Sequence, residues 1–255
     1  MTINQHNEEI KKNLQYWKTK PVLRQIYKAF YKLIAEHLAN LPNGHVVELG
    51  SGIGNIKHII PNCIRTDLFP NQWIDHVENA YRLSFSNNSV SDLILFDVFH
   101  HLRYPGTALK EFQRVLLPNG RVIIFDPCVS SMLGFIVFGL FHHEPLGMTE
   151  PIQWFAPSEW NPDIVHYYAA QANASRIFFN KEVENRLPQW KMKTKRRLSA
   201  ISYVFSGGYS KPQLYPNVAF PMMRVLDRIC DGMSALFATR LLVVLEKKNS
   251  GEQGA

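Results

Sequence analysis

This 255-residue sequence has no cysteine-pair spacing, no long apolar run and no signal-peptide pattern at its start. Its three cysteines, Cys63, Cys128 and Cys230, are odd in number, show no C-x-x-C spacing and lie in apolar surroundings, so we expect buried, reduced thiols. The longest apolar run covers residues 132–141, well short of the ~20 residues that a membrane-spanning helix needs. The polar start has no signal-peptide pattern. A cytoplasmic protein is the expectation that follows.

Charged residues are also few, and they are concentrated in one segment. Charged residues make up 19% of the chain, and the net charge is +7. Five basic residues lie within residues 191–197. We interpret them as a solvated edge strand that its charge protects against aggregation, with a lipid-headgroup or polyanion contact as the alternative. Aromatic residues do not alternate with basic ones as in proteins that bind single-stranded nucleic acid, so we expect no nucleic-acid partner.

Hydrophobic periodicity predicts strands that alternate with short helices. Residues 8–40 are expected to be helical, with a start signal at Thr19 and Pro21 and an apolar stripe at three- and four-residue spacing. Strands are expected at residues 45–49, 63–67, 75–78, 92–96, 121–126, 191–199 and 240–246. Further helices are expected at residues 55–60, 105–117, 161–168 and 218–237. This order predicts an α/β fold with a doubly wound, mostly parallel seven-stranded sheet, N-terminal helices and a helical, aromatic lid insertion.

The same pattern divides the chain into three parts. We expect a helical cap at residues 1–40, a ligand-binding domain at residues 41–130 plus 191–248, and a lid that binds a second ligand at residues 131–190. Ligands of open parallel sheets bind beyond the carboxyl ends of the strands. Polar residues gather at or just past several of these ends, namely Glu48, Asp67, Asn79, Asp97 and Asp126. A binding site is therefore predicted along this edge.

A glycine-rich loop follows the first expected strand. Gly50, Gly52 and Gly54 allow a tight turn and a close approach of backbone N–H groups to a ligand. A dinucleotide-binding G-x-G-x-x-G loop would need glycine at the position of Asn55, which argues against a nicotinamide-dependent oxidoreductase. Asp67, at the end of the second strand, is placed to accept hydrogen bonds from both hydroxyls of a ribose. Taken alone, the loop leaves a purely structural strand–turn–helix open.

Four segments in the same order resemble the class I S-adenosylmethionine-dependent methyltransferases of the type 11 subgroup. The acid-x-Gly-x-Gly-x-Gly motif stands at residues 48–54, and further motifs of the subgroup are matched at residues 83–92, 99–102 and 114–122. The resemblance implies a Rossmann-like methyltransferase that uses S-adenosylmethionine as its cofactor. Residues 41–130 plus 191–248 would then be the cofactor-binding methyltransferase domain.

The resemblance also implies which residues hold the cofactor. The methionine end and the ribose side would lie against Glu48, Gly50, Ser51, Gly52 and Gly54. Asp67 would bind the ribose hydroxyls, Asn79 and Ala80 would lie against the adenine, and Phe96 would complete the set. The family usually has aspartate where Asn79 stands. An amide oxygen can still accept a hydrogen bond from the adenine amino group.

Histidines and one glutamate near the expected site are candidates for the chemistry. Methyl transfer to oxygen or nitrogen needs an aligned acceptor and a base, for which histidine is suited. The candidates are His100, His101, His142, His143 and Glu144. We select His101, His143 and Glu144 as catalytic residues, with packed or capping histidines as the structural alternative. Adjacent side chains point in different directions, so residues 142–144 cannot easily face one ion, and no metal is expected.

Aromatic residues crowd the expected lid and indicate the kind of acceptor. They favour a small-molecule acceptor that is apolar, aromatic or lipid-linked, with packing of the lid's own core as the alternative; they are Phe135, Phe138, Phe141, Trp154, Phe155, Trp160, Tyr167 and Tyr168. Residues 132–141 could instead be an interfacial segment in peripheral contact with a membrane. The alternative function is a catalytically silent, cofactor-binding subunit of a biosynthetic complex. The oligomeric state stays open.

Overall fold

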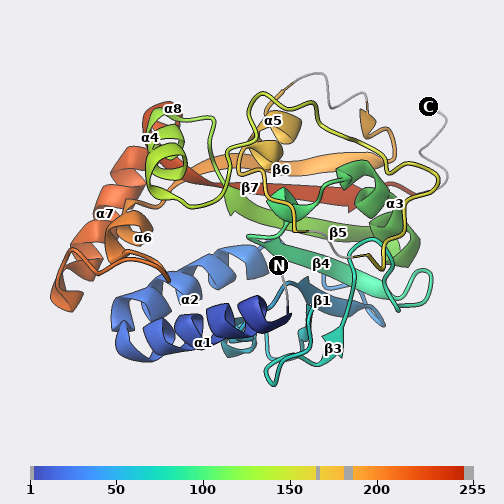
Figure 1. Ribbon diagram of the computed structural model, residues 1–255, viewed down its shortest axis with the longest axis horizontal. Helices are drawn as coiled ribbons and strands as arrows, with labels where there is room; N and C mark the ends of the chain where they lie inside the picture. The colour runs from blue at the N-terminus through green and yellow to red at the C-terminus, as the bar shows by residue number, and fades with distance from the viewer. Residues whose placement is uncertain (1–2, 165–166, 181–185, 250–255) are drawn as a thin grey trace.

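Seven strands form one sheet through the middle of the molecule (Figure 1). The computed structural model describes residues 3–164, 167–180 and 186–249. The strands are β1 (His45–Leu49), β2 (Ile64–Asp67), β3 (His76–Val77), β4 (Val90–Phe96), β5 (Leu116–Pro127), β6 (Trp190–Ser199) and β7 (Ala238–Lys247). Their order is β3-β2-β1-β4-β5-β7-β6, and only the pairings of β7 with β5 and β6 are antiparallel. The predicted mostly parallel seven-stranded α/β sheet is confirmed.

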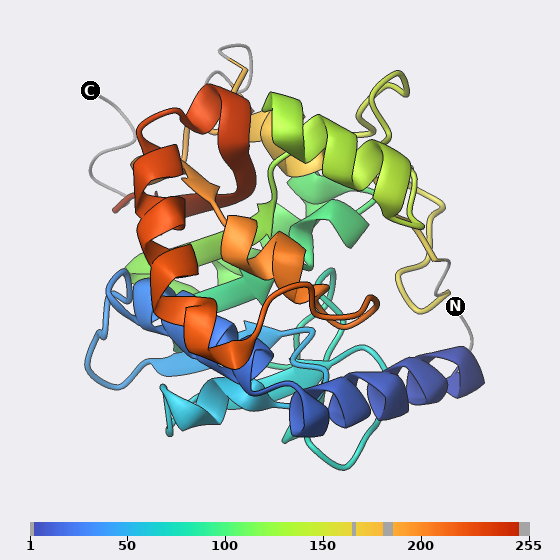
Figure 2. The ribbon, with the colours of Figure 1, turned by 90° about the vertical axis from the view of Figure 1, so that its left-hand side faces the viewer.

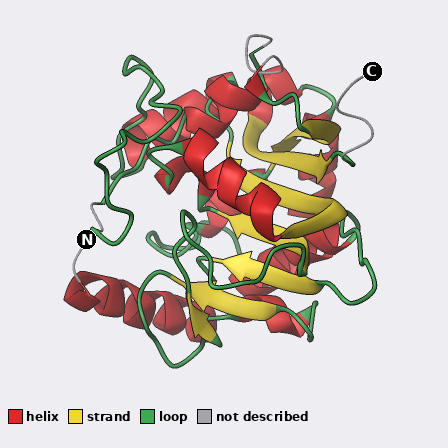
Figure 3. Cartoon of the chain, turned by 90° about the vertical axis from the view of Figure 1, so that its right-hand side faces the viewer, coloured by secondary structure: helices red, strands yellow, loops and turns green. Residues whose placement is uncertain are grey.

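Helices cover both faces of this sheet, which twists as it crosses the molecule (Figure 3). The α-helices are α1 (Ile3–Thr19), α2 (Pro21–Ala35), α3 (Pro105–Val115), α4 (Met132–Ile136), α5 (Asn173–Phe178), α6 (Ile201–Ser206), α7 (Phe220–Asp231) and α8 (Ser234–Phe237). Shorter helical turns are η1 (Asn55–His58), η2 (Phe99–His101), the π-helical η3 (Val137–Phe141) and η5 (Asn217–Ala219). Residues that directly follow β1 and β4, together with Asp67 at the end of β2, line a cavity at the carboxyl ends of these strands.

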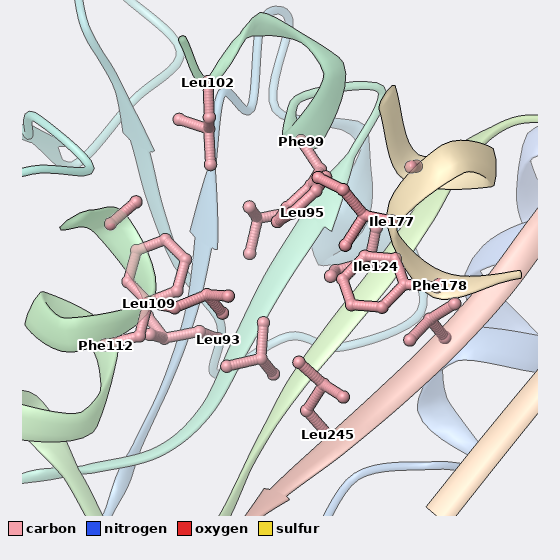
Figure 4. Close-up of a cluster of buried hydrophobic side chains, with 14 of the residues drawn as sticks. Leu93, Leu95, Phe99, Leu102, Leu109, Phe112, Ile124, Ile177, Phe178 and Leu245 are labelled. Carbon is pink, nitrogen blue, oxygen red and sulfur yellow. The ribbon is translucent and has the colours of Figure 1, made fainter. Parts of the chain in front are cut away.

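One face of the sheet packs against α3 and α5 (Figure 4). Leu93 and Leu95 of β4 point to this side, where Phe112 of α3 and Phe178 of α5 meet them. Phe112 is fully buried, and burial of such a side chain stabilises the fold by about 1.5–3 kcal/mol. The alternate residues Ile94 and Phe96 point to the opposite face, as the two-residue period of a strand requires.

The opposite face packs against α2 and α6. Pro21 begins α2, because its fixed φ suits the first helical position and its missing N–H is not needed there. Phe30 of α2 packs on Phe125 of β5 with ring centroids 4.9 Å apart. Lys20, at the α1–α2 junction, is buried, and its ammonium group donates to the carbonyl oxygens of Ser206 (3.2 Å) and Gly208 (2.7 Å). The junction is thereby tied to the turn that follows α6.

Three helix predictions need correction. The helical region expected over residues 8–40 is formed by α1 and α2, and α2 begins at Pro21, where the start signal lies, but it ends at Ala35 and not at residue 40. The helix expected over residues 161–168 is wrong for its described residues, which form turns and irregular backbone. Residues 161–163 instead lie against residues 79–82 through polar contacts, and tertiary contacts of this kind override a weak helical pattern. The helix expected over residues 218–237 is interrupted between α7 and α8.

Other predictions agree with the structure. Cys63, Cys128 and Cys230 are free and buried. The basic segment within residues 191–197 lies on β6, at the edge of the sheet. Among the described residues, no helix is long and apolar enough to cross a membrane. The division into cap, binding domain and lid stays a prediction.

Candidate active site

The glycine loop turns sharply between β1 and η1. Gly50, Gly52 and Gly54 have φ values of 69°, 53° and 68°, which other residues adopt at a cost. A Cβ atom on Gly50 would lie 2.5 Å from Cγ2 of Val98. The Ser51 amide donates to the Thr66 carbonyl oxygen of β2 at 2.7 Å. The loop is thus held in a form that only glycine tolerates, and Gly50, Ser51 and Gly52 line a large cavity.

Asp67 ends β2 at the wall of the same cavity. Its carboxylate accepts hydrogen bonds from the amides of Gly52 (3.0 Å) and Leu68 (2.7 Å). Nε2 of His6, on α1, lies 3.4 Å from Oδ1 of Asp67. The hydrogen bond to Asp67 raises the pKa of His6 against the effect of burial. No pattern in the sequence pointed to His6, because only the packing of α1 brings it here.

Glu48 lies behind the loop and does not line the cavity. Its side chain is 1% exposed, and Oε1 accepts a hydrogen bond from the Tyr31 hydroxyl at 2.9 Å. Oε2 is buried without a hydrogen-bond partner. Burial raises the pKa of Glu48 to about 7. The role of Glu48 in holding the methionine end stays a prediction, and the structure places it where it supports the loop from beneath.

The residues expected at the adenine lie on the cavity wall. Asn79, Ala80 and Phe96 all line it. The Asn79 amide donates to the Pro162 carbonyl oxygen at 2.7 Å and accepts from the Tyr81 amide at 3.0 Å. Its side chain therefore holds the segment around Pro162 across the cavity. Gly54 lies outside the lining, at the start of η1.

A buried ion pair contributes to the wall of the cavity. Arg240 of β7 is 2% exposed and pairs with Asp97, which directly follows β4. Four aromatic rings surround its guanidinium group within 6 Å, those of Phe30, Phe96, Phe125 and Tyr203. Burial works against the charge, but Asp97 outweighs it and raises the pKa of Arg240. Arg240 was not among the predicted site residues, because β7 lies far from Asp97 along the chain.

Two histidines after β4 meet Glu144 at the opposite wall. His100 is 3% exposed, and its backbone amide and Nδ1 both contact Asp126 Oδ2, at 2.9 and 3.2 Å. Its Nε2 lies 3.5 Å from Oε2 of Glu144. Burial opposes a charge on this imidazole, but Asp126 and Glu144 outweigh that effect and raise the pKa of His100 to about 10.

His101 lies beside His100 but has a different environment. Its Nδ1 donates to the Tyr168 carbonyl oxygen at 2.9 Å, and its Nε2 lies 3.8 Å from Oε1 of Glu144. Burial lowers the pKa of His101 to about 4. The Glu144 carboxylate also accepts hydrogen bonds from the Tyr167 hydroxyl and the Gln171 amide. Despite the opposing effect of burial, the hydrogen bond from His100 and the neighbouring His101 hold the pKa of Glu144 well below its usual range.

The structure separates the three residues selected as catalytic. His101 and Glu144 lie together, whereas His143 is exposed and stacks on His142 with ring centroids 4.7 Å apart. One donor atom each from His100, His101 and Glu144 lie within 4.8 Å of one another. The sequence did not indicate that these two histidines meet Glu144, because they lie far from it along the chain. No sequence pattern pointed to Gln171, which also contacts Glu144.

The cofactor loop and the histidine cluster open into one cavity of about 1720 Å³. Helix α1 and helix α4 with η3 run along two edges of the molecule (Figure 2), and both contribute lining residues. The aromatic residues expected in the lid divide into three groups. Trp160 and Tyr168 are half-buried. Phe138 and Trp154 are buried, whereas Phe135, Phe141, Phe155 and Tyr167 are exposed.

Comparisons with known proteins agree with this geometry. Residues 47–124 match the family model described as "Methyltransferase domain". Among solved structures, a SAM-dependent methyltransferase from Archaeoglobus fulgidus is 13% identical, with a TM-score of 0.50 over 88% of this chain and 94% of that one. A SAM-dependent methyltransferase from Thermotoga maritima is 12% identical, with a TM-score of 0.52 over 94% and 99%.

A third structure is that of a geranyl diphosphate C-methyltransferase from Streptomyces coelicolor A3(2), in complex with Mg²⁺, a substrate analogue and S-adenosyl-L-homocysteine. It is 10% identical, with a TM-score of 0.51 over 86% of this chain and 75% of that one. At such identities the structural likeness establishes the fold. Among curated proteins, none matches the chain by sequence.

Proposed function

We propose that the chain is an S-adenosylmethionine-dependent methyltransferase that methylates an oxygen or nitrogen of a small, apolar or aromatic metabolite, free or lipid-linked. The match of residues 47–124 to the methyltransferase-domain model and the fold shared with S-adenosylmethionine-dependent methyltransferases support the first part. The observation that carries this proposal is the shared cavity. Its volume of about 1720 Å³ exceeds the roughly 300–1,000 Å³ of a site for one small molecule. It has room for the cofactor and an acceptor together.

The cofactor would occupy the end of the cavity nearest the glycine loop. Backbone amides of the loop can approach its methionine part closely, because Gly50 and Gly52 carry no side chain. The Asp67 carboxylate is the group for the ribose hydroxyls, and Ala80 and Phe96 offer apolar surface to the adenine. The Asp67 carboxylate has His6 beside it. Cofactor binding would therefore displace or reuse that contact.

The acceptor would occupy the end lined by α4, η3 and the segment around Tyr167. Leu133, Val137 and Phe138 present apolar side chains there, and Trp160 and Tyr168 present aromatic ones. Apolar surroundings of this kind bind the body of a metabolite and leave a few polar groups to orient it. At this end, the polar groups of the wall include His101 and Glu144.

The reaction is an in-line displacement at the methyl carbon. The acceptor's lone pair forms the new bond, the carbon–sulfur bond breaks, and its electron pair stays on sulfur, which yields S-adenosylhomocysteine. The protein's contribution is to align the two reactants and exclude water. A hydroxyl acceptor also gives up a proton. We place this hydroxyl beside His101 and Glu144, which can accept its hydrogen bond and orient it, and their lowered pKa values direct the released proton to solvent. His143 stays outside this set.

Calorimetric titration with S-adenosylhomocysteine tests the cofactor half of the proposal. We expect saturable binding, and the variant Asp67→Asn should bind about ten-fold or more weakly, because hydrogen bonds to a charged group contribute about 1.5–3 kcal/mol each. Glu159→Gln, at an exposed carboxylate outside the cavity, is the matched control and should bind like the wild type. Absence of heat and of a thermal shift at millimolar ligand would refute the cofactor assignment.

The acceptor half is tested by incubation of the protein with methyl-labelled S-adenosylmethionine and a small-molecule extract. We expect the label in an apolar product of low mass, attached to oxygen or nitrogen when the product is analysed by mass spectrometry and NMR. Label attached to carbon would contradict the predicted acceptor atom. Label found only in protein or nucleic acid would contradict the predicted acceptor class.

A further inference from the structure

We propose that His100, His101 and Glu144 form a binding site for a divalent transition-metal ion, of which zinc is the best match. One donor atom of each residue lies within 4.8 Å of the others, and Nε2 of each histidine faces a carboxylate oxygen of Glu144. The histidines lie on η2, and Glu144 lies on the segment after η3. All three line the cavity.

The distances suit a small ion. Tetrahedral bonds of about 2.1 Å to nitrogen and oxygen place the donor atoms about 3.4 Å apart. Glu144 Oε2 lies 3.5 Å from His100 Nε2, and Glu144 Oε1 lies 3.8 Å from His101 Nε2. Small rotations of the side chains would bring the donor atoms to the separation that a bound ion requires. Two imidazoles and one carboxylate with an open position are a donor set of catalytic zinc sites, and imidazole also suits iron, nickel and copper.

The orientation of His101 is the strongest support for an ion. Its Nδ1 must hold the proton, because it bonds to the Tyr168 carbonyl oxygen, which can only accept. Nε2 of a neutral ring then presents a lone pair, and that lone pair faces the Glu144 carboxylate. The His100 ring lies beside these two acceptors, and an ion bound to all three donors would take the place of the proton on its Nε2. A metal ion satisfies both acceptors.

Each of the three side chains also has the outer partner that is typical of a metal ligand. His100 Nδ1 bonds to the buried carboxylate of Asp126, and His101 Nδ1 bonds to a backbone carbonyl group. Such partners fix the tautomer and turn Nε2 toward the metal. Glu144 is held by Tyr167 and Gln171, one on each oxygen, and each oxygen keeps a lone pair for an ion.

The same arrangement explains why the sequence pointed away from a metal. In the sequence only the adjacent residues 142–144 form an evident set of donors, and their side chains diverge because neighbouring side chains point in different directions. In the structure the donors come from two segments, and only Glu144 of the three adjacent residues belongs to the set. Three protein ligands leave coordination positions for water or for an oxygen or nitrogen atom of a second ligand.

Titration of the chelator-treated protein with ZnCl₂ in a calorimeter tests the site. We expect one ion per chain with micromolar or tighter affinity, and Co²⁺ should give the visible absorption of a four- or five-coordinate ion. Glu144→Gln and His101→Gln should each weaken zinc binding by about 100-fold or more. Asp126→Asn, which removes an outer partner, should weaken it by about 10–100-fold. Circular dichroism of each variant confirms that it is folded.

Two controls keep the test decisive. His76→Ala removes an exposed histidine on β3, and His143→Ala removes the neighbour of Glu144 that lies outside the donor set. Both should bind zinc like the wild type. The proposal is overturned if zinc does not bind, if Glu144→Gln binds it unchanged, or if a control loses it equally. The titration contains no S-adenosyl ligand, so its outcome is independent of the proposed methyl transfer.

Discussion

The two ends of the cavity are built in different ways. We call residues 48–54 with Asp67 the cofactor end, and His100, His101, Asp126, Glu144, Tyr167 and Gln171 the acceptor end. At the cofactor end, backbone amides and one carboxylate make the contacts, and Gly52 and Asp67 are 15 residues apart. At the acceptor end, side chains make them, and the hydrogen-bonded partners are 23, 26 and 27 residues apart.

Rigidity therefore has a different source at each end. The cofactor end is fixed by short-range backbone contacts, namely those of the Ser51 amide with the Thr66 carbonyl oxygen and of the Gly52 amide with Asp67. Its three glycines permit the left-handed turn that these contacts hold. The acceptor end is fixed by a polar network, whose members hold one another in place. A substitution at the first end should change one ligand contact. A substitution at the second should change several partners at once.

The largest expected effect on stability is that of a substitution at Asp97, the partner of Arg240. Asp97→Asn removes the charge but keeps a residue that tolerates the positive φ of 56°. Arg240 would stay buried without its counter-ion, so we expect the free energy of unfolding to fall by about 3 kcal/mol. Urea denaturation measures this. Asp163→Asn, which breaks the exposed pair with Arg82, should cost about 0–1 kcal/mol; equal losses would show that burial of Arg240 does not matter.

The next effect separates packing from ligand contact at the acceptor end. Phe138 is 6% exposed and Phe141 is 68% exposed, although both lie on η3. Phe138→Ala should lower the free energy of unfolding by about 2 kcal/mol, somewhat less than in a large core because its cluster is small. Phe141→Ala should change it by less than about 0.5 kcal/mol. Chemical denaturation of both variants measures the two changes in the free energy of unfolding. Similar decreases for both variants would contradict the division into core and surface aromatics.

A pH dependence should appear at the cofactor end through Glu48. Burial raises its pKa from 4.5 to about 7 in the folded protein. The folded state therefore binds more protons than the unfolded state between these values, and stability falls as the pH rises through this window. From pH 5 to pH 8 the wild type should lose about 2 kcal/mol relative to Glu48→Gln. Urea midpoints at both pH values measure the difference, with Glu159→Gln as the exposed control; parallel pH profiles would contradict the raised pKa.

The smallest effect in free energy concerns the shape of the cofactor loop. Gly50→Ala adds a Cβ atom at positive φ, 2.5 Å from Val98. We expect S-adenosylhomocysteine to bind about ten-fold more weakly, which corresponds to ~1.4 kcal/mol. Zinc binding at the acceptor end should change little. Gly232→Ala, at an ordinary helical φ, is the control. If Gly50→Ala binds S-adenosylhomocysteine with wild-type affinity, the loop can accommodate a Cβ atom at this position.

The sheet, the glycine turn and the polar residues at the strand ends could be predicted from the amino-acid sequence. These features follow from local rules, because strand periodicity and the left-handed freedom of glycine act between near neighbours. The motif at residues 48–54 is recognisable for the same reason, since all of its residues are close together along the chain. The density of charge within residues 191–197 likewise predicted the edge position of β6.

The groups that meet across the cavity depend on how distant elements pack. His6 reaches Asp67 because α1 packs beside the glycine loop, and Arg240 reaches Asp97 because β7 runs antiparallel to β5. Glu144 joins the two histidines because the segment near Gln171 pairs with both η2 and the residues that follow Glu144. Contacts between residues so distant along the chain leave no periodic trace in the sequence. They depend on the sum of many weak packing interactions, which is settled only when the whole chain folds.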